Sequence, residues 1–224
     1  MQWNLARLQK QIAGMNRDAI LERTLNVVEI FHSIQGEGAN SGKSAVFVRL
    51  SSCNKNCNFC DTDWSVGVDM TVKQIFEIVD SYLHDSVYQH NLLIWTGGEP
   101  TLQLDDDILS CFSGYYNCIE TNGSMPVPSK IDYISCSPKV SSAILKRNFT
   151  KVNELRFPIA VGDELPLISD LPAADHYFVS PIFVGNPKEM FSIDNDNVEY
   201  CIQLVKNNPQ WSLSVQMHKL LNIR

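Results

Sequence analysis

Short apolar runs alternate with helix-type segments along most of this chain, and this alternation is the feature that most limits its fold. The runs that are candidate strands cover residues 25–31, 45–50, 92–95, 118–120, 131–136, 152–157 and 177–179. Strands separated by helices favour a parallel sheet with right-handed crossovers. At 224 residues the chain is short for a complete eightfold barrel, which typically needs about 250 residues. We therefore predict an α/β fold, an incomplete TIM-type barrel with about six parallel strands.

The helical segments carry signals of their own. Thr71 and Gln74 form a capping box, and the apolar residues after them share one helical face. Further helices are predicted over residues 104–112 and around residues 198–205. Residues 1–24 place apolar side chains at helical spacing among polar ones, which predicts a helical N-terminal extension. The main domain then covers residues 25–224.

The charge balance limits the partners that this chain can have. It contains 18 basic and 25 acidic residues, a formal net charge of −7. This balance argues against the broad electropositive surface that nucleic-acid binding requires. No segment has the roughly 20 consecutive apolar residues of a membrane-spanning helix, and the N-terminus lacks the apolar run of a secretion signal. We expect a cytoplasmic protein with no nucleic-acid or membrane partner.

Three of the seven cysteines, Cys53, Cys57 and Cys60, form the pattern C-x3-C-x2-C. Structural zinc needs four ligands, and this segment contains no fourth Cys or His. A four-iron cluster held by three cysteines leaves one iron open to another ligand. The spacing favours a catalytic iron–sulfur cluster, and zinc with a distant fourth ligand is the alternative.

A second motif follows the candidate strand at residues 92–95. Its residues are Thr96, Gly97, Gly98, Glu99 and Pro100. Paired glycines let the backbone approach a ligand closely, and Glu99 offers a carboxylate to an ammonium group. Together with the cysteine triplet, this segment resembles the radical S-adenosylmethionine superfamily.

Further segments resemble one family within that superfamily, the 7-carboxy-7-deazaguanine synthases. They are residues 31–38 (FHSIQGEG), 48–50 (VRL), 60–62 (CDT), 120–123 (ETNG), 137–139 (SPK) and 214–221 (SVQMHKLL). The resemblance implies a lyase that converts 6-carboxy-5,6,7,8-tetrahydropterin to 7-carboxy-7-deazaguanine with loss of ammonia, in deazapurine and queuosine precursor biosynthesis. It also implies a [4Fe-4S] cluster, S-adenosylmethionine and Mg²⁺ as cofactors, an electron donor such as flavodoxin, and a homodimer.

The same resemblance implies roles for single residues. The cluster ligands are Cys53, Cys57 and Cys60. The residues implied in substrate binding are Ile34, Gln35, Gly36, Arg49 (on the carboxylate) and Thr96. The residues implied in S-adenosylmethionine binding are Gly97, Gly98, Glu99, Ser137, Pro138 and Lys139.

Two further roles concern a metal and the chain end. Thr62 is implied as a ligand of Mg²⁺, which needs substrate and water to complete its octahedron. Family members often end in a proline whose carboxylate meets the substrate, whereas this sequence ends in Arg224, so an Arg224 contact is only an expectation. Two other functions stay open: a radical activase that acts on a partner protein, and a non-catalytic zinc-binding module.

Overall fold

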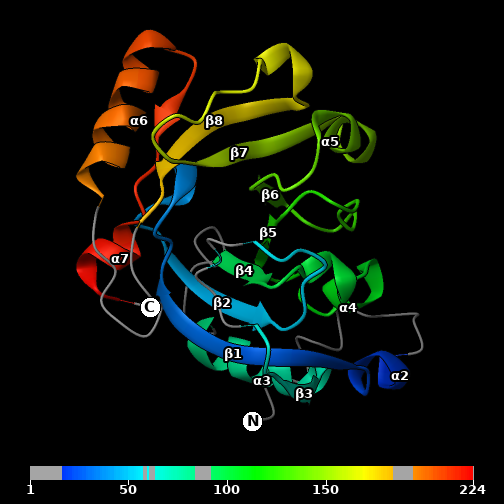
Figure 1. Cartoon of the computed structure of the whole chain (residues 1–224). Helices are drawn as coiled ribbons and strands as arrows, with labels where there is room; N and C mark the ends of the chain where they lie inside the picture. Colours follow the sequence, from blue (N-terminus) through cyan, green and yellow to red (C-terminus); the bar gives the residue numbers. More distant parts are fainter. Residues whose placement is uncertain (1–16, 58–59, 61–63, 84–91, 184–193, 224) are drawn as a thin grey trace.

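The structure is a computed structural model, and it describes residues 17–57, 60, 64–83, 92–183 and 194–223. The strands form one sheet in the order β3-β1-β2-β4-β5-β6-β7-β8-β9. Their bounds are β1 Thr24–Ile34, β2 Ser44–Leu50, β3 Val68–Thr71, β4 Leu92–Gly97, β5 Tyr116–Thr121, β6 Tyr133–Cys136, β7 Lys151–Ile159, β8 Ala173–Pro181 and β9 Ser212–Leu213. Figure 1 shows these strands curving into an open arc.

The parallel part of the sheet confirms the predicted fold class. From β2 through β4, β5, β6, β7 and β8 to the two-residue β9, every neighbouring pair is parallel. The sequence pattern did not indicate the pairing of β1, which is antiparallel to both β2 and β3. An alternating apolar pattern does not specify strand direction, so this pairing depends on tertiary structure.

Most of the helices lie between two strands along the chain and pack against the convex face of the sheet. They are α2 Arg17–Leu21, α3 Val72–Leu83, α4 Asp106–Ser110, α5 Ser142–Asn148, α6 Asn195–Asn207 and α7 Met217–Leu221. Short 3-10 turns are η1 Gly38–Asn40, η3 Pro100–Leu102 and η4 Ile168–Asp170. The predicted capping box is present, because Thr71 N–H donates to Gln74 Oε1 at 2.8 Å and Gln74 N–H donates to Thr71 Oγ1 at 3.1 Å.

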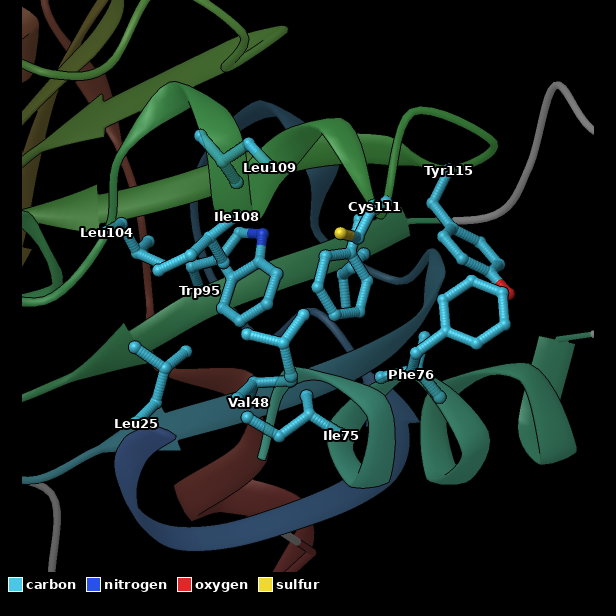
Figure 2. Packing of buried hydrophobic residues seen from close by; sticks show 14 of the residues in the cluster. Leu25, Val48, Ile75, Phe76, Trp95, Leu104, Ile108, Leu109, Cys111 and Tyr115 are labelled. Atoms are coloured by element: carbon cyan, nitrogen blue, oxygen red, sulfur yellow. The ribbon is translucent and has the colours of Figure 1, made fainter. Parts of the chain in front are cut away.

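The largest apolar core lies between the sheet and the helices α3 and α4. Val48, Trp95 and Ile119 from three parallel strands meet Ile75 and Phe76 of α3 there. Figure 2 shows Trp95 and Phe76 in this layer. Burial of these side chains is the main favourable contribution to folding on this side of the sheet.

A second core lies under α5 and α6. Leu145 of α5 and Cys201 of α6 pack with Leu155 and Val179 of the two long strands β7 and β8. Figure 1 shows α6 beside β8. The late helix predicted around residues 198–205 is therefore confirmed as α6, whereas the helix predicted over residues 104–112 is shorter and ends at Ser110.

The N-terminal extension is described only in part. Residues 1–16 lie outside the described residues, and α2 packs Ile20 and Leu21 into the first core. None of the helices in the described ranges combines the length and apolar character that crossing a bilayer requires.

Candidate functional site

A row of polar side chains crosses the concave face of the sheet, one residue from each of the six strands β1, β2, β4, β5, β6 and β7. It consists of Glu29, Arg49, Thr96, Glu120, Ser135 and Glu154, which we call the inner row. The strand register pairs Glu29 with Arg49, Arg49 with Thr96, Glu120 with Ser135, and Ser135 with Glu154. Alternate residues of a strand face opposite sides, so these positions point away from the two apolar cores.

Arg49 lies at the β1 side of the inner row. Its Nε donates to Glu29 Oε1 at 2.9 Å, and its guanidinium lies 5.8 Å from the centre of the Phe31 ring. Phe31 in turn stacks on Phe47 at 4.9 Å between ring centres. The Arg49 side chain is 22% exposed. An ion pair and an aromatic surface therefore hold this guanidinium in place.

Glu120 lies in the middle of the inner row and accepts hydrogen bonds from three sides. Thr96 Oγ1 donates to its Oε2 at 2.7 Å, while Gln35 Nε2 and a nitrogen of Arg156 donate to its Oε1 at 3.1 and 2.8 Å. Burial acts to raise the pKa of Glu120, but the Arg156 charge and these hydrogen bonds outweigh it and lower the pKa to about 2. Glu120 is therefore a fixed, ionised carboxylate.

The β7 side of the inner row is acidic around a single guanidinium. Arg156 contacts Glu37 at 2.7 Å and Glu120 at 2.8 Å, and its Nε lies 3.3 Å from Glu154. Burial acts against its charge, but the three carboxylates raise the pKa of Arg156. Three carboxylates around one guanidinium leave an excess of negative charge, which favours a ligand that presents hydrogen-bond donors.

We call Arg156 and its three carboxylates Glu37, Glu120 and Glu154 the acidic cluster. The turn after β1 packs against it. Gly38 has a φ of +68°, and a Cβ there would lie 2.3 Å from the Glu154 carboxylate, so glycine is required by both conformation and space. A Cβ on Gly36 would lie 2.2 Å from His218 Nδ1. Met217 N–H donates to Gly36 O at 2.9 Å. The C-terminal segment is thus packed onto this turn.

Sequence-predicted substrate residues are brought together only in part by these contacts. Gln35 and Thr96 both donate to Glu120, and Arg49 is paired with Thr96 in the strand register. Ile34 is the last residue of β1, where it pairs with Ser44 at the beginning of β2.

The cysteine segment follows β2 at the carboxyl ends of the parallel strands. Cys53 and Cys57 are half-buried and Cys60 is exposed, and none of the three is in a disulfide. Asn122, directly after β5, donates to Cys53 Sγ at 3.9 Å and to Asn54 Oδ1 at 2.9 Å. Burial raises the pKa of the Cys53 thiol.

The paired glycines support this segment through their backbone. Gly98 N–H donates to Leu50 O at 2.9 Å, and Glu99 N–H donates to Ser52 O at 2.8 Å. A Cβ on Gly97, whose φ is +125°, would lie 2.0 Å from Leu50 O. A Cβ on Gly98 would lie 1.9 Å from Ser52 O. The glycines are needed so that the end of β4 can lie directly against the chain that leads to the cysteines.

Glu99 is fully buried and its carboxylate is engaged within the protein. Its oxygens accept from Thr101 N–H and Oγ1 at 3.1 and 2.6 Å, from Thr121 Oγ1 at 2.8 Å and from Asn122 N–H at 2.7 Å. This arrangement ties the chain just after β4, which carries Glu99, to the end of β5.

The Ser137, Pro138 and Lys139 segment leaves β6 at the same edge of the sheet. Ser137 N–H donates to Thr121 O, and Lys139 N–H donates to Asn122 O, each at 2.9 Å. Lys139 Nζ donates to Ser137 Oγ at 2.9 Å. Burial lowers the pKa of Lys139, and the neighbouring thiols of Cys57 and Cys136 oppose this shift.

Three thiolates suit a four-iron cluster, in which each can bind a different iron and the fourth iron stays open. Within the described ranges, no three Cys, His, Asp or Glu side chains come together as ligands of one ion. Thiolates that hold a four-iron cluster each bind a different iron, so they need not converge on one point. Thr62, the expected magnesium ligand, and Arg224 both lie outside the described residues.

A hollow of about 550 Å³ opens at the other end of the sheet. Ser44, Leu92 and Tyr116, which begin β2, β4 and β5, are among its lining residues. No member of the inner row lines it, so it does not coincide with the site described above.

Sequence reasoning missed the acidic cluster. It assigned no role to Glu154 or Arg156, although the two charged residues lie two positions apart, on one face of the strand predicted over residues 152–157. Two charged residues on one face of a buried strand are a usable signal, because such groups are rarely buried unless they are paired.

Comparison with known proteins agrees with the motifs. Residues 48–140 match the model of the Radical SAM superfamily. A 7-carboxy-7-deazaguanine synthase of Bacteroides thetaiotaomicron is 38% identical over 198 residues, 88% of this chain and 97% of the relative. Those of Burkholderia multivorans and Haemophilus influenzae are 36% and 37% identical, over 89% and 90% of this chain and 99% and 95% of the relatives.

The fold has a counterpart among solved structures. The crystal structure of QueE from Escherichia coli superposes with a TM-score of 0.65, covering 92% of this chain and all of that one at 20% identity. The family relation therefore depends on the sequence matches and the fold relation on this superposition. Both agree with a cysteine segment at the carboxyl ends of a partly closed parallel sheet, and the chain belongs to the 7-carboxy-7-deazaguanine synthase family of radical S-adenosylmethionine enzymes, lyases that use a [4Fe-4S] cluster.

Proposed function

We propose that this chain converts 6-carboxy-5,6,7,8-tetrahydropterin to 7-carboxy-7-deazaguanine with loss of ammonia. The observation that carries the proposal is the inner row, in which the guanidinium of Arg49 and the carboxylate of Glu120 lie on strands two apart, with Thr96 between them. These groups complement the two ends of a carboxylated pterin.

The spacing supports this assignment. Neighbouring strands lie about 4.8 Å apart, so Arg49 and Glu120 are separated by about 10 Å of sheet. A pterin is a two-ring plate with a carboxylate at one end and an amino-pyrimidinone at the other. Arg49 binds the carboxylate with its planar pair of N–H donors, and Glu120 accepts from the amino and ring N–H groups.

The turn after β1 completes the substrate site. Gln35 orients Glu120 through a hydrogen bond and offers its own amide to the ring. Ile34 and Gly36, on either side of it, contribute backbone groups to the pterin. Closure of this turn by the C-terminal segment excludes water from the reacting ring.

The cofactors lie at the carboxyl end of the strands. Cys53, Cys57 and Cys60 hold the cluster, which when bound supplies the electron that cleaves S-adenosylmethionine to methionine and a 5′-deoxyadenosyl radical. The residues Gly97, Gly98 and Glu99, with Ser137, Pro138 and Lys139, bind S-adenosylmethionine beside them, and Glu99 offers its carboxylate to the ammonium group. Hydrogen removal at C6 of the pterin then requires that the ring stay fixed between Arg49 and Glu120 while it contracts.

A magnesium ion and Thr62 form a finer part of the proposal. A hard cation that bridges the substrate and the Thr62 hydroxyl oxygen restrains the ring during the rearrangement. We expect Thr62→Ala to keep its iron and lose most of the magnesium-dependent rate. An unchanged rate across a magnesium titration removes Thr62 from the mechanism.

The remaining expectations concern the localisation, oligomeric state, electron donor and domain boundaries of the enzyme. We propose a cytoplasmic homodimer that receives electrons from a donor such as flavodoxin, with residues 25–224 as the catalytic domain and residues 1–24 as an extension. Ile20 and Leu21 support a packing role for the end of this extension, since both are buried in the first core.

The alternative functions differ in what they need from the concave face. A radical activase that takes hydrogen from a partner protein needs an open docking surface, whereas the charged groups here lie inside the arc of the sheet. A zinc-binding module needs no inner row. The row therefore favours a small bicyclic substrate over both alternatives.

One assay separates these functions. Anaerobically reconstituted, reduced enzyme is incubated with S-adenosylmethionine and 6-carboxytetrahydropterin, and the products are analysed by mass spectrometry together with ammonia. We expect 7-carboxy-7-deazaguanine and ammonia in equal amounts, and Arg49→Lys to be a poor enzyme because an ammonium cannot replace the planar guanidinium. S-adenosylmethionine cleavage without any pterin product contradicts the proposal.

A further inference from the structure

Arg156 contacts three carboxylates that belong to three separate parts of the chain. One terminal nitrogen is 2.7 Å from Glu37 in the turn after β1, and the other is 2.8 Å from Glu120 on β5. Its Nε is 3.3 Å from Glu154 on β7 itself. One guanidinium therefore joins the turn that carries Gln35 to the middle of the inner row.

The exposed fractions of the side chains show which group can contact a ligand and which groups are buried behind it. The side chain of Arg156 is 7% exposed and that of Glu154 is 3% exposed. The side chain of Glu120 keeps 23% of its surface exposed. Glu120 can therefore reach a ligand on the concave face, whereas the Arg156 side chain is almost completely buried.

We infer that Arg156 is a positioning residue: it holds Glu120 and the turn at Gln35 in the one arrangement that meets the donor edge of the pterin. The inference rests on the function proposed above, and it adds to it a residue that acts on the substrate through Glu120. It predicts that the geometry of the guanidinium matters as well as its charge.

The geometry explains why lysine is a poor replacement. A guanidinium has two terminal nitrogens in one plane, and here they hold Glu37 and Glu120 at the same time. An ammonium at the end of a flexible chain keeps the charge and lacks this planar pair. Arg156→Lys should therefore keep the charge of the cluster while Glu120 loses its fixed direction.

A stabilising role alone makes a different prediction. If Arg156 served only to keep the fold together, its replacement would weaken all ligands alike and lower the iron content. Glu120 has two further donors, Thr96 and Gln35, so it stays in the inner row when Arg156 is changed. The two roles can therefore be separated by measuring two ligands in the same protein.

The test measures equilibrium binding to the reconstituted enzyme without reductant, so that no turnover occurs. Calorimetry gives the dissociation constants of 6-carboxytetrahydropterin and of S-adenosylmethionine for the wild type and for Arg156→Lys. Arg23→Lys is the matched control, because Arg23 also holds a carboxylate, Asp105, with both terminal nitrogens, away from the inner row. Glu120→Gln and the double variant Glu120→Gln/Arg156→Lys complete a double-mutant cycle, which measures whether the two substitutions affect pterin binding independently.

We expect Arg156→Lys to weaken pterin binding at least about tenfold. S-adenosylmethionine affinity and iron content should stay within about twofold of the wild type, as should all values for Arg23→Lys. In the Glu120→Gln background, Arg156→Lys should add less than about twofold, since the residue that it positions has been changed.

Three results overturn the inference. The first is wild-type pterin affinity in Arg156→Lys, and the second is an additive cycle, which shows that Arg156 does not act through Glu120. The third is equal weakening of both ligands, the sign of a general structural role. If the wild type itself fails to bind the pterin, the proposed function fails and the inference fails with it, whereas the first three results leave the proposed function intact.

Discussion

The two faces of the sheet use the same strands for opposite purposes. On the convex face, Val48, Trp95 and Ile119 pack into an apolar core under the helices. On the concave face, their sequence neighbours Arg49, Thr96 and Glu120 form the inner row. In β2, β4 and β5, one residue therefore packs into the core under the helices and the next belongs to the site, beside a smaller apolar cluster that includes Phe47 and Ile94.

This difference shows where each face gets its specificity. The convex face tolerates exchange among apolar residues of similar volume, because burial is not directional. The concave face depends on directed contacts, such as the 2.7 Å hydrogen bond from Thr96 to Glu120, which one atom can break. Substitutions on the two faces should therefore have separable effects on unfolding and on chemistry.

The largest expected effect comes from the cysteines at the carboxyl ends of the parallel strands. Replacing Cys53, Cys57 and Cys60 together by alanine should remove the cluster and reduce activity to below detection, because these thiolates are its ligands. Iron and sulfide analysis after anaerobic reconstitution measures this directly. Cys111→Ala, in the buried α4 region, is the control that should keep full iron content. Full iron retention in the triple variant contradicts the assignment.

Two adjacent residues of β4 give the sharpest comparison of the faces. Trp95 is fully buried in the first core, so Trp95→Ala should lower the free energy of unfolding by about 3–5 kcal/mol. Thr96→Val, one residue later, should lower it by only about 1 kcal/mol through the lost hydrogen bond to Glu120.

In the activity assay the order of the two variants should be reversed, with the larger change in Thr96→Val. Thr96→Val should raise the KM for the pterin, while Trp95→Ala that is still folded should keep a KM close to the wild-type value. Urea unfolding and steady-state kinetics on both variants check this. Equal changes in KM would show that the two faces are not independent.

The parts of the fold that were predictable from sequence belong to the convex face. The helix of residues 72–83 has an apolar stripe and a capping box, and β4 and β5 are short apolar runs. These are local signals, which neighbouring residues determine. The pairing of β1 with β2 and the short helix α5 had no such signal, because they depend on contacts between distant segments.

The site was predictable to the extent that its residues lie in motifs. Gln35, Arg49 and Thr96 were singled out from motifs, and the structure places Gln35 and Thr96 against Glu120. Arg156 was not singled out, since its contact with Glu37 joins residues 119 positions apart. Glu99 is expected to offer its carboxylate to an ammonium group, and this role stays a prediction; the four hydrogen bonds that the carboxylate accepts from the protein are a feature that the sequence pattern does not reveal.

Acid should affect the concave face through Glu120. Its folded-state pKa of about 2 lies below the ordinary value of 4.5, so the stability that it contributes is present above pH 4.5 and is lost as the pH falls toward 2. Glu120→Gln removes this dependence.

The measurement compares the free energy of unfolding of wild type and Glu120→Gln at several pH values. We expect the difference between them to shrink by on the order of 2 kcal/mol between neutral pH and pH about 2. Asp175→Asn is the control, since it removes an exposed carboxylate on β8 whose ion pair with Lys151 is screened by water and salt. A difference that stays constant across the range contradicts the low pKa.

The smallest effect is expected from an exposed ion pair between the two long strands β7 and β8. Lys151 at the beginning of β7 contacts Asp175 on β8, and their side chains are 59% and 43% exposed. Water and salt screen this pair, so Lys151→Ala should change the free energy of unfolding by less than about 1 kcal/mol, and added salt should reduce even that. Pterin affinity should not change, because Lys151 is not part of the inner row. Arg156, five residues along the same strand, is buried among three carboxylates. If Lys151→Ala lowered the free energy of unfolding as much as Arg156→Lys does, burial would not determine how much an ion pair contributes to stability in this protein. Urea unfolding of both variants at low and high salt decides the point.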